Sequence, residues 1–205
     1  MGDVAKTIEA VWKIESTRLI AAIARVTRDI GIAEELAQDA LVIALEVWPE
    51  EGIPDNPGAW LMTAAKRRAI DSLRRGRMLV QKHGEIAREL EWQQQRLGEA
   101  LDHSLDQVID DDVLRLIFTA CHPVLPMEGR IALTLRLIGG LTTAEIARAF
   151  LVPEKTLGQR ISRAKKTLSE AHVPFETPSG DELRCRVESV LMVVYFIFNE
   201  GYTAT

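Results

Sequence analysis

The stretch LTTAEIARAFLVPEKTLGQRISRAKKTL, residues 141–168, carries the clearest structural signal in this chain. Thr142 and Thr143 are residue types that cap helices, and Glu145 follows in the first turn, where a carboxylate stabilises a helix N-terminus. Leu151-Val152-Pro153 then interrupts the helical pattern, and proline is best tolerated in the first turn of a new helix. The stretch therefore predicts two helices joined by a tight turn.

The second of these helices has one apolar face and one cationic face. Its apolar residues fall four, three and four positions apart, which places them on one side of a helix: Leu157, Ile161, Ala164 and Leu168. Cationic and amide side chains fall largely off that stripe: Lys155, Gln159, Arg160, Arg163 and Lys166. A short helix, a tight turn and a second helix of this kind predict a helix-turn-helix, whose second helix fits the major groove of DNA.

The composition of the whole chain is typical of an all-α protein. Its 205 residues are 27% charged and 5% aromatic, and hairpin signals such as Asn-Gly are almost absent. Residues 1–12 lack the apolar run of a signal peptide, and the longest apolar run is too short to span a bilayer. Cys121 and Cys185 form no CxxC pattern. We therefore expect a protein of the reducing cytoplasm, with no membrane association and no metal or cofactor.

The net charge of −5 hides two cationic blocks. Residues 66–88 hold eight Lys or Arg and two acids, and residues 155–170 hold five and one. Between them, residues 89–115 hold eight acids and two arginines. Phosphate binding responds to local potential more than to total charge, so the two blocks favour contacts with nucleic acid. The alternative for each block is an ordinary solvated helix face.

Three helices are expected in the first part of the chain, at residues 4–28, 33–48 and 57–75. Asp29-Ile30-Gly31 separates the first two, and a loop containing Pro and Gly precedes the third. Asn56 is expected to cap the third helix, which should end near Gly76. Together these segments predict a helical domain of residues 1–78.

A polar and acidic linker is expected at residues 79–105, with a helix at 85–97. A second helical domain, residues 106–172, would contain helices at 110–121 and 126–138 and end in the helix-turn-helix. An extension, residues 173–205, would add one more helix at 181–199.

Three motifs in this order resemble the extracytoplasmic-function class of bacterial RNA polymerase sigma factors, within the sigma-70 family. The first is AEELAQDA at residues 33–40 followed by ALEVW at 44–48, which resembles region 2 of the family. The second is NPGAWL at 56–61 followed by AKRRAIDSLRR at 65–75, which resembles its promoter-melting segment. The helix-turn-helix resembles region 4. The resemblance implies a dissociable polymerase subunit, not an enzyme, that reads the −10 element with region 2 and the −35 element with region 4.

The resemblance also implies which residues do this. Glu34, Glu35, Gln38 and Asp39 would bind the clamp helices of the largest polymerase subunit, and region 4 would meet the flap; complementary charge would orient docking. An ordinary solvated face is the alternative. The −10 contacts would come from Asn56, Lys66, Arg67, Arg68, Asp71, Arg74 and Arg75, with a pocket for an extruded base formed by residues 53–59. Trp60 is either a core residue or a platform for a base.

In the recognition helix, two groups of residues divide the contacts with the −35 element. Lys155, Thr156, Gln159 and Arg160 lie near enough to the N-terminus to reach base edges, and Arg163 and Lys166 are better placed for phosphates.

Two segments depart from the minimal family pattern. Cys121-His122-Pro123 invites a metal interpretation, but one Cys-His pair cannot complete a tetrahedral site, so we expect a buried structural cysteine. The extension carries an apolar face comprising Val187, Val190, Leu191, Val194, Tyr195 and Phe198, which needs a cover. It resembles the start of the tetratricopeptide-type extension of one subgroup, so we expect a truncated chain. The hypothesis is that this helix docks on both domains in cis; the alternative is that it belongs to the missing part.

Two other functions remain to be separated from this one. A transcriptional regulator that acts without polymerase would explain the helix-turn-helix but would leave the acidic helix and the arginine-rich helix without a role. An enzyme with an accessory helix-turn-helix is disfavoured, because the four histidines are scattered and the chain has no Gly-rich phosphate loop.

Overall fold

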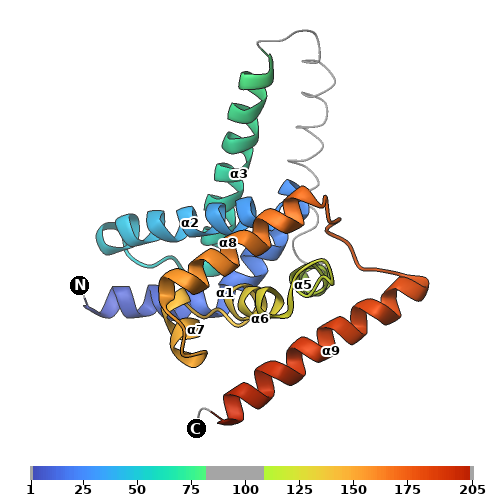
Figure 1. The fold of residues 1–205 in the computed structure, drawn as a ribbon. Helices are drawn as coiled ribbons and strands as arrows, with labels where there is room; N and C mark the ends of the chain where they lie inside the picture. The colour runs from blue at the N-terminus through green and yellow to red at the C-terminus, as the bar shows by residue number, and fades with distance from the viewer. Residues whose placement is uncertain (1, 82–108, 204–205) are drawn as a thin grey trace.

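The computed structural model describes residues 2–81 and 109–203, and within those ranges the chain is helical with no strand (Figure 1). The helices are α1 (Gly2–Thr27), α2 (Ile30–Glu51), α3 (Pro57–Gln81), α5 (Ile109–Ala120), α6 (Met127–Leu137), α7 (Thr143–Ala149), α8 (Glu154–Glu170) and α9 (Gly180–Thr203). The prediction of an all-α fold is confirmed. The predicted linker helix at residues 85–97 lies outside the described residues.

The helix boundaries in the first half correct the sequence-based ones. The side chain of Asp29 accepts hydrogen bonds from the backbone N–H groups of Gly31 at 2.7 Å and Ile32 at 3.0 Å. The predicted break at residues 29–31 is therefore the N-cap and first turn of α2. The predicted end of the third helix near Gly76 is also wrong, because α3 continues through that glycine to Gln81; a helix tolerates an interior Gly at a cost of about 1 kcal/mol.

The predicted cap at the start of α3 is confirmed. The backbone N–H of Ala59 donates to Asn56 Oδ1 at 3.0 Å. Behind this cap, α1, α2 and α3 bury a shared set of apolar side chains that includes Leu19, Trp48 and Leu61, each about 1% exposed. Trp60 meets Trp48 edge to face, with ring centroids 5.3 Å apart.

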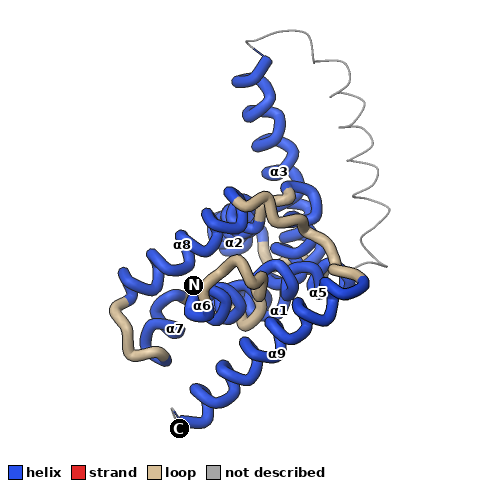
Figure 2. The backbone as a smooth tube through the Cα atoms, turned by 45° about the vertical axis from the view of Figure 1, so that its right-hand side comes forward, coloured by secondary structure: helices blue, strands red, loops and turns tan. Residues whose placement is uncertain are grey.

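The second helical unit, α5 to α8, is joined to the first by one continuous core. Buried residues of α5 to α8, among them Leu116, Leu133 and Leu157, belong to the same apolar cluster as those of α1 to α3. At the end of α6, the hydroxyl of Thr17 donates to the carbonyl oxygens of Leu137 and Ile138 at 3.1 and 3.2 Å. Figures 1 and 2 both show α8 lying across α2. The two predicted domains thus lie directly against one another.

Helix α9 lies along the outside of α5 and α6 (Figures 1 and 2). It buries Arg186, Ser189 and Val193, each at most 6% exposed. Most of the apolar face expected to be covered is open instead: Leu191, Val194, Tyr195 and Phe198 are all more than half exposed. No helix in the described part of the chain is both long and apolar enough to cross a membrane.

Candidate nucleic-acid interface

The helix-turn-helix is built by local hydrogen bonds that its sequence dictates. Thr142 Oγ1 accepts from the Glu145 N–H at 3.2 Å, and the Thr142 N–H donates to Glu145 Oε2 at 2.8 Å, which completes a capping box. The backbone N–H and the hydroxyl of Thr142, both donated to the Glu145 carboxylate, lower the pKa of Glu145 from its ordinary value. Leu151 turns the chain with a left-handed φ of 52°, and Pro153 precedes the first turn of α8. The predicted helix, turn and helix are confirmed.

Helix α8 divides into two faces as the pattern of its residues predicts. The whole apolar stripe is buried: Leu157, Ile161, Ala164 and Leu168. The predicted DNA-contacting side chains fall in two classes of exposure. Lys155, Gln159, Arg163 and Lys166 are exposed, whereas Thr156 and Arg160 are half-buried. A cationic face with its opposite side fixed in the core can approach a DNA groove without losing its support.

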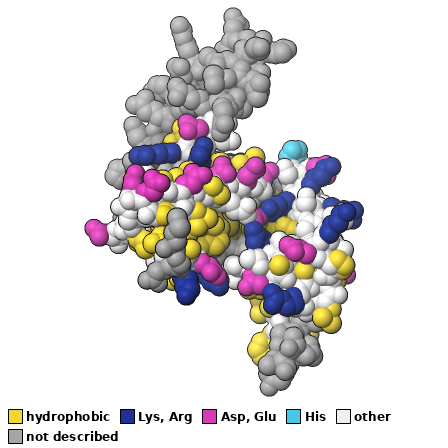
Figure 3. Space-filling model, turned by 90° about the vertical axis from the view of Figure 1, so that its left-hand side faces the viewer, with side chains coloured by type: hydrophobic (Ala, Val, Ile, Leu, Met, Phe, Trp, Pro, Cys, Tyr) yellow, Lys and Arg dark blue, Asp and Glu magenta, His cyan; other side chains and the backbone are white. Residues whose placement is uncertain are grey.

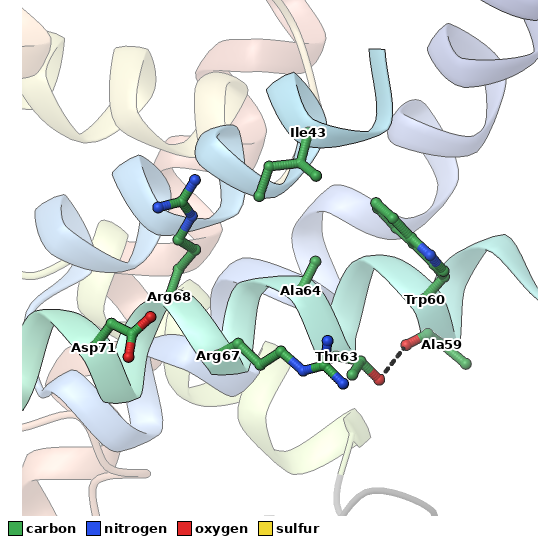
Figure 4. Close-up of a pocket in the computed structure, with 8 residues that line it drawn as sticks. All are labelled: Ile43, Ala59, Trp60, Thr63, Ala64, Arg67, Arg68 and Asp71. Atoms are coloured by element: carbon green, nitrogen blue, oxygen red, sulfur yellow. Dashed lines mark hydrogen bonds between the residues drawn. The ribbon is translucent and has the colours of Figure 1, made fainter. Parts of the chain in front are cut away.

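A second polar surface lies on α3, where an open cavity of about 500 Å³ separates it from α2. Figure 4 shows Arg68 and Trp60 directed from α3 toward α2, near Ile43, with Arg67 running along α3. The cavity is lined by Ile43, Ala59, Trp60, Thr63, Ala64, Arg67, Arg68 and Asp71. It combines an apolar floor, an aromatic ring and two guanidinium groups, a set of groups suited to a base and its phosphates.

This cavity adjoins the loop that the sequence analysis expected to hold a base. Of residues 53–59, only Ala59 lines it. Asn56 is exposed and is engaged in capping α3, and Lys66 is half-buried. Arg74 and Arg75 lie on α3, but their side chains are outside the described residues. Trp60 packs against Trp48 and also borders the cavity, so its role as a platform for a base stays a prediction.

The predicted polymerase-contacting residues on α2 are divided between solvent and the interior. Glu35 and Asp39 are exposed. Glu34 is 3% exposed, and its Oε1 accepts from Gln38 Nε2 and from Arg136 Nε, both at 2.8 Å. Its other oxygen is paired with the ammonium of Lys165. Figure 3 shows a row of acidic side chains on one face of the molecule, with Lys and Arg side chains beside one end of it and further groups of them elsewhere on the face.

The expectation for Cys121 as a structural residue agrees with its surroundings. Its thiol is buried and lies 3.4 Å from Thr134 Oγ1, and burial raises its pKa. The neighbouring His122 accepts the Val124 N–H at Nδ1 at 3.0 Å. Burial, followed by the charges of Arg186 and Arg130, lowers the His122 pKa to about 4, so the ring is neutral in the fold.

Arg136 and Lys165 are the residues that the sequence analysis missed. Arg136 lies on α6 and Lys165 on α8, and each meets Glu34 across more than a hundred residues of chain. No spacing rule links positions so far apart. The available signal was limited to two cations close to the apolar stripes of their helices.

Comparison with known families agrees with these two surfaces. The family model for Sigma-70 region 2 matches residues 14–78, which hold the second half of α1, all of α2 and nearly all of α3. The model for Sigma-70 region 4 matches residues 115–168, which end in the helix-turn-helix. The chain is 33% identical over 156 residues to the ECF RNA polymerase sigma factor SigK of Mycobacterium ulcerans (strain Agy99), covering 74% of this chain and 78% of that protein. The chain belongs to the ECF sigma-70 family.

Other relatives of this ECF sigma-70 protein extend the comparison. SigK of Mycobacterium tuberculosis (strain ATCC 25618 / H37Rv) is 31% identical over 156 residues, with the same coverage of both chains. An uncharacterized protein of Rhizobium meliloti (strain 1021), R00370, is 40% identical over 184 residues, or 89% of this chain. That match covers 43% of the Rhizobium protein, so the chain spans less than half the length of this relative. No solved structure matches.

Proposed function

We propose that this ECF sigma-70 protein directs bacterial RNA polymerase core enzyme to promoters in the cytoplasm, without catalysing any reaction itself. Region 4, α5 to α8, would bind the −35 element, and region 2, α1 to α3, would bind and open the −10 element. The observation that carries the proposal is the division of α8 into a fully buried apolar stripe and an opposite face of exposed cations. The arginine-lined cavity between α2 and α3 supplies a second, separate contact with nucleic acid.

The −35 contact is assigned to the exposed face of α8. Arg160 and Gln159 have the donors and acceptors needed to recognise guanine and adenine edges, and Lys155 and Thr156 lie one turn earlier. Arg163 and Lys166 would bind phosphates. We expect Arg160→Ala to weaken binding to the cognate −35 duplex by about 1–3 kcal/mol and to relax sequence preference at one position.

The matched comparison is Arg163→Ala on the next turn of the same face. This variant should weaken binding to all DNA sequences equally. It should also make the salt dependence of the affinity shallower by about one phosphate contact. Fluorescence anisotropy at several fixed salt concentrations separates the two effects. Unchanged affinity of Arg160→Ala on the cognate duplex would refute its assignment.

The −10 contact is assigned to the cavity on α3. Its volume of about 500 Å³ is ample for one extruded base, with Trp60 as a stacking surface and Arg67 and Arg68 as phosphate ligands. Asn56, Lys66, Asp71, Arg74 and Arg75 would extend this contact along the opened strand. Ala64→Leu should fill the cavity and lower the fluorescence change of a 2-aminopurine probe in the −10 element, while −35 duplex binding stays constant. An undiminished probe signal would show that the extruded base does not bind in this cavity.

The decisive test is run-off transcription with core polymerase. Promoter-specific transcripts that require this protein are expected. Glu35 and Asp39 are accessible for the clamp helices, so Glu35→Lys should reduce co-purification with core enzyme through charge repulsion. A protein that binds its duplex but neither co-purifies with core nor supports transcription would be the polymerase-independent regulator instead.

The extension is assigned a role within the same chain. Helix α9 would stay on region 4 through its buried Arg186, Ser189 and Val193, and so would influence how region 4 meets the polymerase flap. Removal of residues 181–205 should lower the melting temperature and change the contacts that region 4 makes with the polymerase flap. If neither changes, packing of the extension in cis has no consequence for the factor.

A further inference from the structure

The buried carboxylate of Glu34 joins the two halves of the molecule, as that of Asp112 does where it meets Arg25 of α1 at 3.4 Å. Glu34 lies within the segment that matches region 2, whereas Arg136 and Lys165 lie within the segment that matches region 4. Both oxygens of Glu34 are engaged by these cations, one by the Arg136 guanidinium at 2.8 Å and the other by the Lys165 ammonium. Arg136 also donates to the carbonyl oxygen of Leu141, so its position is fixed from both sides.

Because the cluster is buried, the contact between the two regions depends on its cations, which compensate the charge of the Glu34 carboxylate. A carboxylate that is 3% exposed has lost nearly all of its hydration, and its cations replace the lost water. If one cation is removed, the cost of burying the Glu34 carboxylate is less well compensated, and the carboxylate gains by returning to solvent. For that to happen α8 must move off the start of α2, against the apolar core that the two regions share.

The position of Glu34 gives this contact a functional meaning. It is one of the four α2 residues assigned to polymerase, and Gln38, a second one, is held by a hydrogen bond to the same carboxylate. Region 4 therefore buries one of the four residues that the polymerase clamp would use, and a second one is bonded to it. One carboxylate cannot be buried against Arg136 and Lys165 and against the cations of another protein at the same time.

We propose that the Glu34–Arg136–Lys165 cluster is an intramolecular latch, which holds region 4 on the polymerase-binding face of region 2 and keeps the free protein closed. Core polymerase opens the latch by presenting its own cations to α2, and region 4 is then free to reach the −35 element. The proposal rests on the proposed function for its partner, but the closed state is a property of the free chain and is tested without polymerase.

A disulfide can lock the latch at a position that the geometry supplies. A Cβ placed on Gly31 would lie 3.8 Å from the Cβ of Lys165, within the range of natural disulfides. Gly31 has no left-handed φ, and the closest approach is 3.0 Å to Asp29 Oδ1, the oxygen that caps α2, so circular dichroism of the variant must show that the helix is kept. Gly31→Cys with Lys165→Cys is therefore made in a Cys185→Ser background, since Cys185 is exposed and Cys121 is buried.

The same preparation serves as its own control when it is oxidised and then reduced. The oxidised form is covalently closed, and we expect it to bind core polymerase at least about 100-fold more weakly than the reduced form, which also lacks Lys165. Run-off transcription should be lost on oxidation and recovered with reductant. Gly31→Cys alone should respond to neither treatment. Equal binding by the oxidised and reduced forms would overturn the latch as an inhibitory contact.

A second arm measures closure in the free protein. Dyes on exposed positions of the two regions, Glu46→Cys on α2 and Ser162→Cys on α8, report their separation by energy transfer in the same Cys185→Ser background. Arg136→Gln with Lys165→Gln should shift the population to longer distances at unchanged helical content. Lys13→Gln, which removes a cation from an exposed pair with Glu9, should not. An unchanged distance in the double variant would overturn the latch.

The two arms separate the failure of the latch from failure of the proposed function. If no form binds core polymerase, the proposed function is wrong, and the role of polymerase as the opener fails with it. The distance measurement would still decide whether Arg136 and Lys165 hold the free chain closed.

Discussion

Arg130 connects the extension to region 4, and its replacement gives the sharpest stability prediction. Its guanidinium donates three hydrogen bonds: from Nε to the Leu125 carbonyl oxygen at 2.7 Å, and from its two terminal nitrogens to Ser189 Oγ and the Pro123 carbonyl oxygen, both at 3.0 Å. Ser189 in turn donates to the carbonyl oxygen of Cys121. One side chain thus holds both the α5–α6 turn and α9.

The magnitude follows from what each replacement leaves behind. A hydrogen bond from a charged donor contributes about 1.5–3 kcal/mol, and contributions within one network are not additive. Arg130→Met loses all three bonds, but the Pro123 carbonyl oxygen can turn to water. We therefore expect the free energy of unfolding to fall by about 3 kcal/mol. Arg130→Lys keeps the charge but lacks the planar fork that reaches three separated acceptors, so a fall of about 2 kcal/mol is expected.

Urea denaturation followed by circular dichroism measures both variants. Arg148→Lys, on an exposed helix position, is the matched control and should leave the midpoint unchanged. Limited proteolysis adds a local readout, because loss of the Ser189 bond should increase cleavage near the start of α9. A urea midpoint for Arg130→Lys equal to that of the unmodified protein would refute the reasoning. It would mean that the positive charge at residue 130, and not its three hydrogen bonds, stabilises the fold.

Three further predictions concern separate elements. Thr142→Ala removes the hydroxyl of the capping box and should lower the free energy of unfolding by about 1 kcal/mol in urea titrations, whereas Thr142→Ser should not. Trp48→Ala empties a site that is 1% exposed, so a loss of about 3–5 kcal/mol or failure to fold is expected by calorimetry, and Trp48→Phe should lose much less. His122 has a pKa of about 4 in the fold against 6.5 in the unfolded chain. The unfolded chain therefore binds the extra proton between these values, and stability should fall as pH falls through that window. His122→Asn can accept the Val124 N–H in place of Nδ1 and should flatten that part of the stability–pH curve. Identical curves for the two proteins would contradict a half-buried neutral ring.

The local structure was predictable where neighbouring residues decide it. The capping box at Thr142, the cap at Asn56 and the buried stripe of α8 all depend on residues within a few positions of one another. Errors in the boundaries arose where local signals compete. Asp29-Ile30-Gly31 has the composition of a break, but the Asp29 carboxylate satisfies the first N–H groups of α2 and so starts the helix there.

The prediction of the buried face of α9 was wrong for a different reason. Its apolar residues predict one covered face, yet the helix turns Arg186 and Ser189 inward beside Val193. The reason lies on α5, whose last carbonyl groups need donors from outside their own helix. Arg186 donates to the Phe118 carbonyl oxygen at 3.3 Å and places a positive charge at that helix C-terminus, where the dipole favours it. Periodicity in α9 alone contains no information about that need.

The sequence by itself determined the helical class, the helix-turn-helix, the cationic face of α8 and the arginines of α3, because each follows from spacing along a single helix. Only the tertiary structure decided that Glu34 faces Arg136 and Lys165 and that the two regions share one core. The physical reason is that burying a carboxylate requires cations at fixed positions in space, and the chain brings them together from 102 residues away or more only when the two regions pack.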